Sequence, residues 1–163
     1  MKGKTMKPNI GITDNNRESV AAILNTLLAD EYLLYTKTRK YHWNVTGPHF
    51  NDLHKFFQSQ YEELNDIVDD VAERARSLGE VSDGTMTEFL KKTRLSEQPG
   101  KVPDANGMLQ NLLKHHESII KSLRTDIETC DKKYGDAGTT DFLTQVMEKH
   151  EKMAWMLRAT VQE

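Results

Sequence analysis

Apolar residues recur every three or four positions along four long segments of this chain. The first segment runs over about 14–41, and the second begins after a Gly-Pro pair and ends near Gly79. The third and fourth segments cover about 108–127 and 142–157. This spacing places the apolar side chains on one face of an α-helix, and no segment shows the alternation of a strand. The sequence therefore predicts an all-α chain.

The helix boundaries and the long connection predict the architecture. Asp14, Asn15 or Asn16 is suited to cap the first helix, because short polar side chains accept hydrogen bonds from free backbone N–H groups. Thr85 and Glu88 have the spacing of a capping box and predict a short helix around TEFLKKT, followed by the loop SEQPGKVPDANG. Four long helices with this short helix between the second and third predict a four-helix bundle.

Length and composition favour a single domain with a short basic tail. The chain has 163 residues, no long apolar run and no secretory signal, so we expect one cytoplasmic domain over 13–163. Residues 1–12 are expected to form a flexible tail that carries Lys2, Lys4 and Lys7, although the whole chain has a net charge of −3. Such a tail either binds DNA phosphates or only keeps the protein soluble, and the sequence leaves both open.

A metal site within one bundle is not expected. No glutamate is followed three residues later by histidine, the pattern that di-iron bundles use on two of their helices. His116 and His150 each lie on an apolar stripe and are interpreted as hydrogen-bonded core histidines, whereas His115 is expected to face solvent. Cys130 is either a small buried hydrophobe or a surface thiol.

The stretch HWNVTGPHFNDLHKFF, residues 42–57, concentrates metal-binding side chains around a Gly-Pro break. His42 ends the first helix, and His54 lies one turn into the second. Asp69 and Glu73 follow on the same helix, one turn apart and on one face. Imidazole and carboxylate groups together suit iron or another first-row divalent ion.

One copy of the chain cannot use all four side chains for one ion. His54 and Asp69 are 15 residues apart, which places them roughly 22 Å apart on a continuous helix. A second copy running antiparallel across a two-fold axis would bring the histidines of one subunit to the acids of the other. The alternative is that Asp69 and Glu73 are solvated surface acids.

The quoted stretch, followed by the segment DDVAER at 69–74, resembles the signature of the Dps family, also called miniferritins or DNA-binding proteins from starved cells. The resemblance covers nearly the whole chain, because the order of the long and short helices also matches. It implies the ferritin-like fold and a hollow dodecamer that oxidises Fe(II), preferably with hydrogen peroxide. The Fe(III) mineral is kept inside the shell, which protects the cell from oxidative damage.

The resemblance also implies roles for single residues. His42 and His54 would bind iron, or another divalent metal in its place, together with Asp69 and Glu73 of the partner subunit. Glu73 would bridge the two metal positions, and Trp43 would lie beside the centre and intercept oxidising equivalents. The family's alternative activity is compaction of nucleoid DNA, here through the lysine tail with weak ferroxidase activity.

Gln58 departs from the family pattern, which usually has an aspartate one turn after the second histidine. An amide brings no negative charge, so we expect the second metal position to be weak, with Gln58 contacting a water or the second ion. The resemblance also assigns Asp141, with Asp136 as a second candidate, to an acidic pore through which iron enters. Capping of the last helix is a compatible role for both aspartates.

Overall fold

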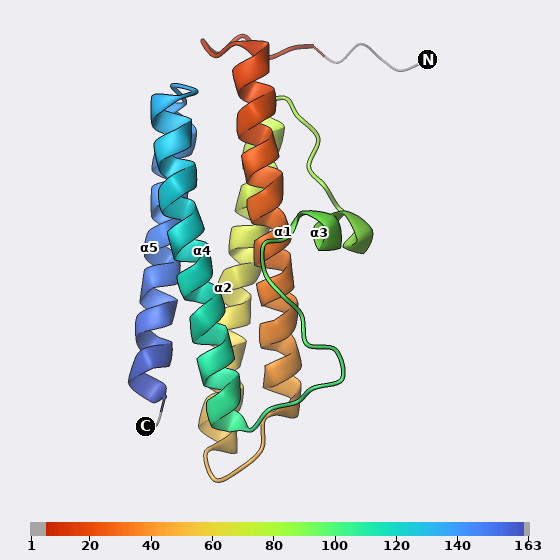
Figure 1. Cartoon of the computed structure of the whole chain (residues 1–163), viewed down its shortest axis with the longest axis vertical. Helices are drawn as coiled ribbons and strands as arrows, with labels where there is room; N and C mark the ends of the chain where they lie inside the picture. The colour runs from red at the N-terminus through yellow and green to blue at the C-terminus, as the bar shows by residue number, and fades with distance from the viewer. Residues whose placement is uncertain (1–5, 162–163) are drawn as a thin grey trace.

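In the computed structural model, which describes residues 6–161, the chain forms α-helices and no strand within that range (Figure 1). The helices are α1 (Asp14–Asn44), α2 (Phe50–Ser77), α3 (Met86–Lys92), α4 (Ala105–Lys132) and α5 (Ala137–Thr160). No helix of the described range has the length and apolar character that a membrane span requires. The predicted all-α fold is confirmed.

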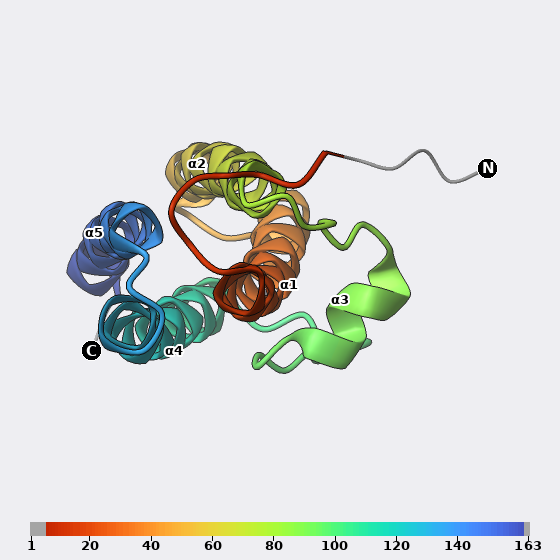
Figure 2. The same ribbon diagram turned by 90° about the horizontal axis from the view of Figure 1, so that it is seen from above.

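The four long helices form two antiparallel hairpins, α1 with α2 and α4 with α5, that pack side by side (Figures 1 and 2). The connection from α2 to α4 runs the length of the bundle on the outside of α1 and carries α3. Because of this long crossover, α2 and α4 run in the same direction, which distinguishes the ferritin-like arrangement from a simple up-and-down bundle. The short helix therefore lies where the sequence predicted it.

Caps fix the helix ends, with one difference from the expectation. Thr85 and Glu88 form the predicted capping box at α3. At α1 the cap is Thr13, which accepts from the backbone N–H of Asn16, so the helix begins at Asp14 and the expected cap residues lie inside it. A threonine hydroxyl caps a helix as Asp or Asn side chains do, so the sequence alone did not distinguish Thr13 from the polar residues that follow it.

Residues 6–13 fold back over the carboxyl end of α2. Gly79 has a φ of +86°, and a Cβ built on it would lie 2.6 Å from Cγ of Pro8. The buried Arg17 guanidinium donates to the carbonyl of Leu78 at 2.6 Å, and Lys7 pairs with Asp14. The part of the expected tail that the structure describes is thus in contact with the bundle.

The crossover is tied to the bundle by an ionic network at its centre. The buried carboxylate of Asp30, on α1, accepts from Thr93 Oγ1 at 2.9 Å and from Arg94 Nε at 2.7 Å. Arg94 also donates to Asp126 of α4 at 3.0 Å, and Phe89 of α3 stacks on Tyr32 with 4.6 Å between ring centroids.

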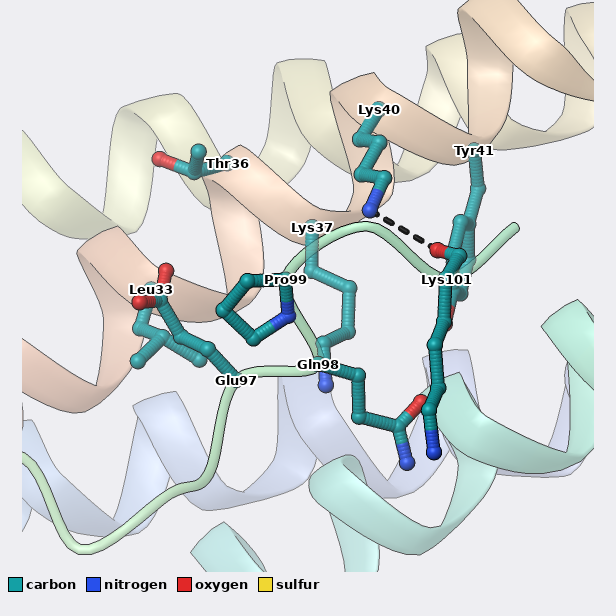
Figure 3. Close-up of a pocket in the computed structure, with 9 residues that line it drawn as sticks. All are labelled: Leu33, Thr36, Lys37, Lys40, Tyr41, Glu97, Gln98, Pro99 and Lys101. Atoms are coloured by element: carbon teal, nitrogen blue, oxygen red, sulfur yellow. Dashed lines mark hydrogen bonds between the residues drawn. The ribbon is translucent and has the colours of Figure 1, made fainter. Parts of the chain in front are cut away.

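Two lysines of α1 hold the remainder of the crossover. Lys37 Nζ donates to the carbonyl of Ser96 at 3.0 Å, and Lys40 Nζ donates to the carbonyl of Lys101 at 2.9 Å. Figure 3 shows the hydrogen bond from Lys40 to Lys101. Both residues line a hollow of about 220 Å³ between α1 and the loop. Both amines therefore fasten the loop to α1.

The bundle core contains a buried polar cluster from three helices. His150 Nε2 lies 2.8 Å from Oε1 of Glu31, and His150 Nδ1 lies 2.9 Å from Nδ1 of His116. All three side chains are fully buried. The interpretation of His116 and His150 as hydrogen-bonded core residues is confirmed, and they are each other's partner. Cys130 is also buried, which raises the pKa of its thiol to about 12.

His115 is buried as well, so the expectation that it faces solvent is wrong. It is only 8% exposed, and Lys37, whose Nζ is bound to the crossover at Ser96, lies against it with Nζ 3.3 Å from His115 Nδ1. Burial, and next the neighbouring ammonium, lower the pKa of His115 from 6.5 to about 4. His115 is therefore neutral in the folded protein near neutral pH.

Acidification should destabilise the fold through His115. Below its ordinary pKa of 6.5, the unfolded chain binds a proton that the folded chain does not, so stability falls as the pH drops toward about 4. By pH 5.5 this loss amounts to about 1.4 kcal/mol for this one side chain. Chemical denaturation near neutral pH and at about pH 5.5 measures it, and His115→Gln should lose less stability than the parent over that interval. Equal losses in the two proteins would contradict the assignment.

Candidate metal centre

The connection between α1 and α2 brings two histidines together. Buried Val45 ends α1 by donating to the carbonyl of Tyr41 at 2.9 Å. Gly47 then turns the chain with a φ of +116°, a conformation that residues with a Cβ rarely adopt. Because α2 begins at Phe50, just after this turn, His42 in the last turn of α1 and His54 in the second turn of α2 face each other.

His42 and His54 fix each other's orientation through two reciprocal hydrogen bonds. Nδ1 of His42 lies 2.7 Å from the carbonyl oxygen of His54, and Nδ1 of His54 lies 2.8 Å from the carbonyl oxygen of His42. A carbonyl only accepts, so each Nδ1 carries its proton and donates. When both rings are neutral, each Nε2 therefore has a free lone pair. Such backbone bonds are how proteins orient metal-binding imidazoles.

Aromatic rings surround this histidine pair. The two imidazoles stack with 3.7 Å between centroids, Phe50 stacks on the outer face of His54 at 5.1 Å, and Tyr61 meets His42 edge-on at 5.2 Å. His42 is only 8% exposed, and His54 is half-buried. These neighbours hold the rings in place.

A cation lies beside the pair within the same aromatic group. The guanidinium carbon of Arg39 is 5.1 Å from the ring centroid of Trp43 and 5.5 Å from those of Tyr35 and Tyr61. Trp43, expected near the centre, is 62% exposed and lies over this guanidinium. Nε of Arg39 is buried and has no hydrogen-bond partner among the described residues.

The predicted acids lie elsewhere on α2. Asp69 and Glu73 are both exposed, and the helix is unbroken between them and His54, so a single chain does not bring the four side chains together. Within residues 6–161 no three His, Cys, Asp or Glu side chains are grouped closely enough to hold a metal. Asp69 instead lines an open hollow of about 450 Å³ with Asp66, Asp70 and Lys149.

Gln58 is joined to an acid that the sequence reasoning did not consider. Its amide Nε2 donates to Oε1 of Glu62 at 2.8 Å, one turn further along α2. His54, Gln58 and Glu62 therefore follow one another on a single face of the helix. Their spacing of four residues was the signal that could have identified Glu62.

The two candidate pore aspartates differ in exposure. Asp136 is 2% exposed: it caps α5 by accepting from Thr139 N at 3.0 Å and Thr139 Oγ1 at 2.6 Å, and it pairs with Arg74 at 3.2 Å. Its carboxylate is thus used inside the chain, and a pore-lining role for Asp136 does not fit. Asp141 is exposed and accepts only from Gln145 of its own helix in the described structure.

Of the three tail lysines, only Lys7 lies within the described residues, where it pairs with Asp14. This contact raises the pKa of Lys7 through a hydrogen bond to the carboxylate and lowers the pKa of Asp14. Lys2 and Lys4 lie outside the described residues, so DNA binding by the tail stays a prediction.

Comparisons with known proteins identify the fold and the family. A family model described as a ferritin-like domain matches residues 21–163. An uncharacterized low temperature-induced protein of Nostoc is 47% identical over 154 residues, covering 94% of this chain and 86% of that protein. A DNA protection during starvation protein of Bacillus anthracis is 34% identical over 143 residues, or 87% of this chain and 96% of its own length.

Solved structures give the same result. The Dps protein of Vibrio cholerae, described as a member of a superfamily of ferritin-like diiron-carboxylate proteins, superposes with a TM-score of 0.89 at 29% identity. The match covers 96% of this chain and 97% of that one. The chain therefore belongs to the ferritin-like superfamily and, within it, to the Dps family of miniferritins.

Proposed function

We propose that this protein oxidises Fe(II) at centres shared by two subunits and stores the Fe(III) product inside a dodecameric shell. Hydrogen peroxide is the oxidant in this proposal, and the protein acts in the cytoplasm. The observation that carries the proposal is the histidine pair. Both Nδ1 atoms of His42 and His54 are bound to backbone carbonyls, so both Nε2 atoms are available to a metal without any rearrangement of the turn.

The partner subunit would supply the carboxylates. Asp69 and Glu73 lie exposed on α2, at the other end of the same helix from His54. An antiparallel pairing of two α2 helices would bring these acids to the partner's histidines and create two identical sites. The exposed Trp43 and Phe50, next to His42 and His54, are apolar surface that such an interface would cover.

The ligand chemistry fits iron oxidation. Fe(II) is the substrate, and mixed imidazole and carboxylate ligands suit it. Anionic oxygen ligands stabilise Fe(III) more than Fe(II), since the ion with the higher charge gains more from them. Iron would enter through a pore lined by Asp141, because a ring of carboxylates concentrates cations at an opening.

A role in DNA protection is the second candidate, favoured by the name of the Bacillus anthracis relative, a DNA protection during starvation protein. The described residues support it less than they support the iron centre. Lys7 already pairs with Asp14, and the body of the chain carries the excess of acids. We therefore rank DNA binding behind iron oxidation.

Anaerobic titration with Fe(II), followed by peroxide, tests the proposed activity. The parent should bind Fe(II) tightly, form Fe(III) on peroxide addition and have a dodecameric mass by light scattering. His42→Ala should reduce Fe(II) affinity by at least about tenfold, since loss of a metal ligand costs more than the 10- to 100-fold of an outer-shell change. His49→Ala removes an exposed histidine at the start of α2 and is the matched control. An equal loss in both variants, or none, would refute the site.

Gln58→Asp should strengthen the second iron position. The substitution restores a negative charge one turn after His54, where the parent has an amide bound to Glu62. The variant should bind the second Fe(II) more tightly and oxidise iron faster under stopped-flow conditions. Gln58→Asn shortens the side chain in the same way but keeps the amide, and it should show no such gain. If iron occupancy and rate of Gln58→Asp equal those of the parent, the amide does not limit the site.

A further inference from the structure

Three of the five tyrosines form a continuous row that starts at the histidine pair. Tyr61 meets His42 at 5.2 Å between centroids, Tyr35 lies 6.2 Å from Tyr61, and Tyr32 lies 5.8 Å from Tyr35. Each step is within the range of directly contacting aromatic rings. The row follows α1 away from the turn and ends beneath α3, where Tyr32 stacks on Phe89.

We propose that this row is an electron relay in which Tyr61, and then Tyr35 and Tyr32, supply the second electron that peroxide needs when only one iron is bound. The proposal rests on the proposed ferroxidase function. Its motivation is the amide at Gln58, which leaves the second iron position without the charge that would fill it firmly. A site with one Fe(II) has one electron to give, whereas peroxide takes two.

The reaction balances with one tyrosine as reductant. Fe(II) gives one electron and becomes Fe(III), while the phenol of Tyr61 gives one electron and its proton and becomes a neutral tyrosyl radical. The O–O bond of hydrogen peroxide breaks, and its two oxygens take up two electrons, the phenolic proton and one proton from solvent to form two water molecules. No hydroxyl radical is released. The radical then passes to Tyr35 when that phenol in turn gives an electron and a proton.

Arg39 makes the row suitable for this chemistry. Its guanidinium lies over Tyr61 and Tyr35, each at 5.5 Å, and its Nη1 donates to the phenolic oxygen of Tyr35 at 2.9 Å. A cation next to an aromatic ring disfavours a second positive charge on that ring. Oxidation of these tyrosines therefore proceeds to the neutral radical. Trp43 shares the guanidinium but is not part of the row, and it is far more exposed to solvent.

Of the two remaining tyrosines, Tyr134 provides the control. Tyr134 follows α4 at the opposite end of the bundle, where its carbonyl accepts from Asn16 at 3.1 Å. Asn16 and His42 are separated by 26 residues of α1, or roughly 39 Å. Tyr134→Phe thus removes the same hydroxyl group as Tyr61→Phe without touching the row. Tyr41 lies next to His42 in sequence but is buried and bonded to Asn111, outside the row.

Freeze-quench electron paramagnetic resonance tests the relay. Protein loaded with one Fe(II) per site is mixed with one equivalent of peroxide, and Fe(III) and organic radical are measured in the same samples. The parent should show a radical whose signal narrows when the protein carries ring-deuterated tyrosine. Tyr61→Phe should lose more than half of the radical per Fe(III) formed and should release hydroxyl radical to a spin trap. Tyr134→Phe should match the parent.

Peptide mass spectrometry of the parent supplies a second measurement that needs no variant. Oxidised tyrosine should accumulate at Tyr61, Tyr35 and Tyr32 and not at Tyr134. Fe(III) formation without a tyrosyl signal, or with a signal that Tyr61→Phe leaves intact, overturns the relay and leaves the ferroxidase proposal standing. If the parent forms no Fe(III) with peroxide, both proposals fail.

Discussion

The continuity of α2 is the constraint on which this metal centre depends. The helix runs without a break from Phe50 to Ser77, so the histidine at its start and the acids near its end cannot approach each other within one chain. A kink would need a proline or a comparable defect, and α2 contains no proline. The candidate ligands are therefore held rigidly in two separate half-sites, and the chemistry that we propose becomes available only through association.

The two half-sites differ in how far their side chains are preorganised within one chain. The histidine half is fixed within the chain by two reciprocal backbone hydrogen bonds, by Phe50 stacked on His54 and by Tyr61, which meets His42 edge-on. The acidic half consists of exposed carboxylates, which cost little to keep solvated until a partner arrives. Oriented imidazoles in one half-site and exposed, solvated carboxylates in the other suit a site that receives iron as a substrate and then passes it on.

Much of this could be predicted from the sequence because it depends on local physics. Helical periodicity predicted the bundle, and the spacing of Thr85 and Glu88 predicted the cap of α3. The Gly47-Pro48 break predicted the turn that brings the two histidines together. The number of residues between His54 and Asp69 was enough to exclude a site within one chain. The family resemblance then supplied the roles of these residues, which spacing alone left open.

Other features depend on packing between distant segments, which no local pattern records. Nothing in the sequence distinguishes Glu31 from the surface acids of α1, but in the folded chain His150 of α5 packs against it. The sequence does not separate Asp136 from Asp141, yet in the fold Asp136 is bound to Arg74 of α2, whereas Asp141 is exposed. His115 likewise is buried and contacts Lys37 of another helix, and the tyrosine row forms only because Tyr61 of α2 packs against Tyr35 of α1.

Mixing two inactive variants tests the shared centre most directly. One variant carries His42→Ala and His54→Ala, and the other carries Asp69→Ala and Glu73→Ala. In a mixed pair, one of the two sites receives intact histidines from one chain and intact acids from the other. Co-assembly in equal amounts should therefore restore about a quarter of the parental Fe(II) oxidation, while each variant alone shows almost none. Mixed assemblies that stay as inactive as the separate variants would contradict a centre built from two subunits.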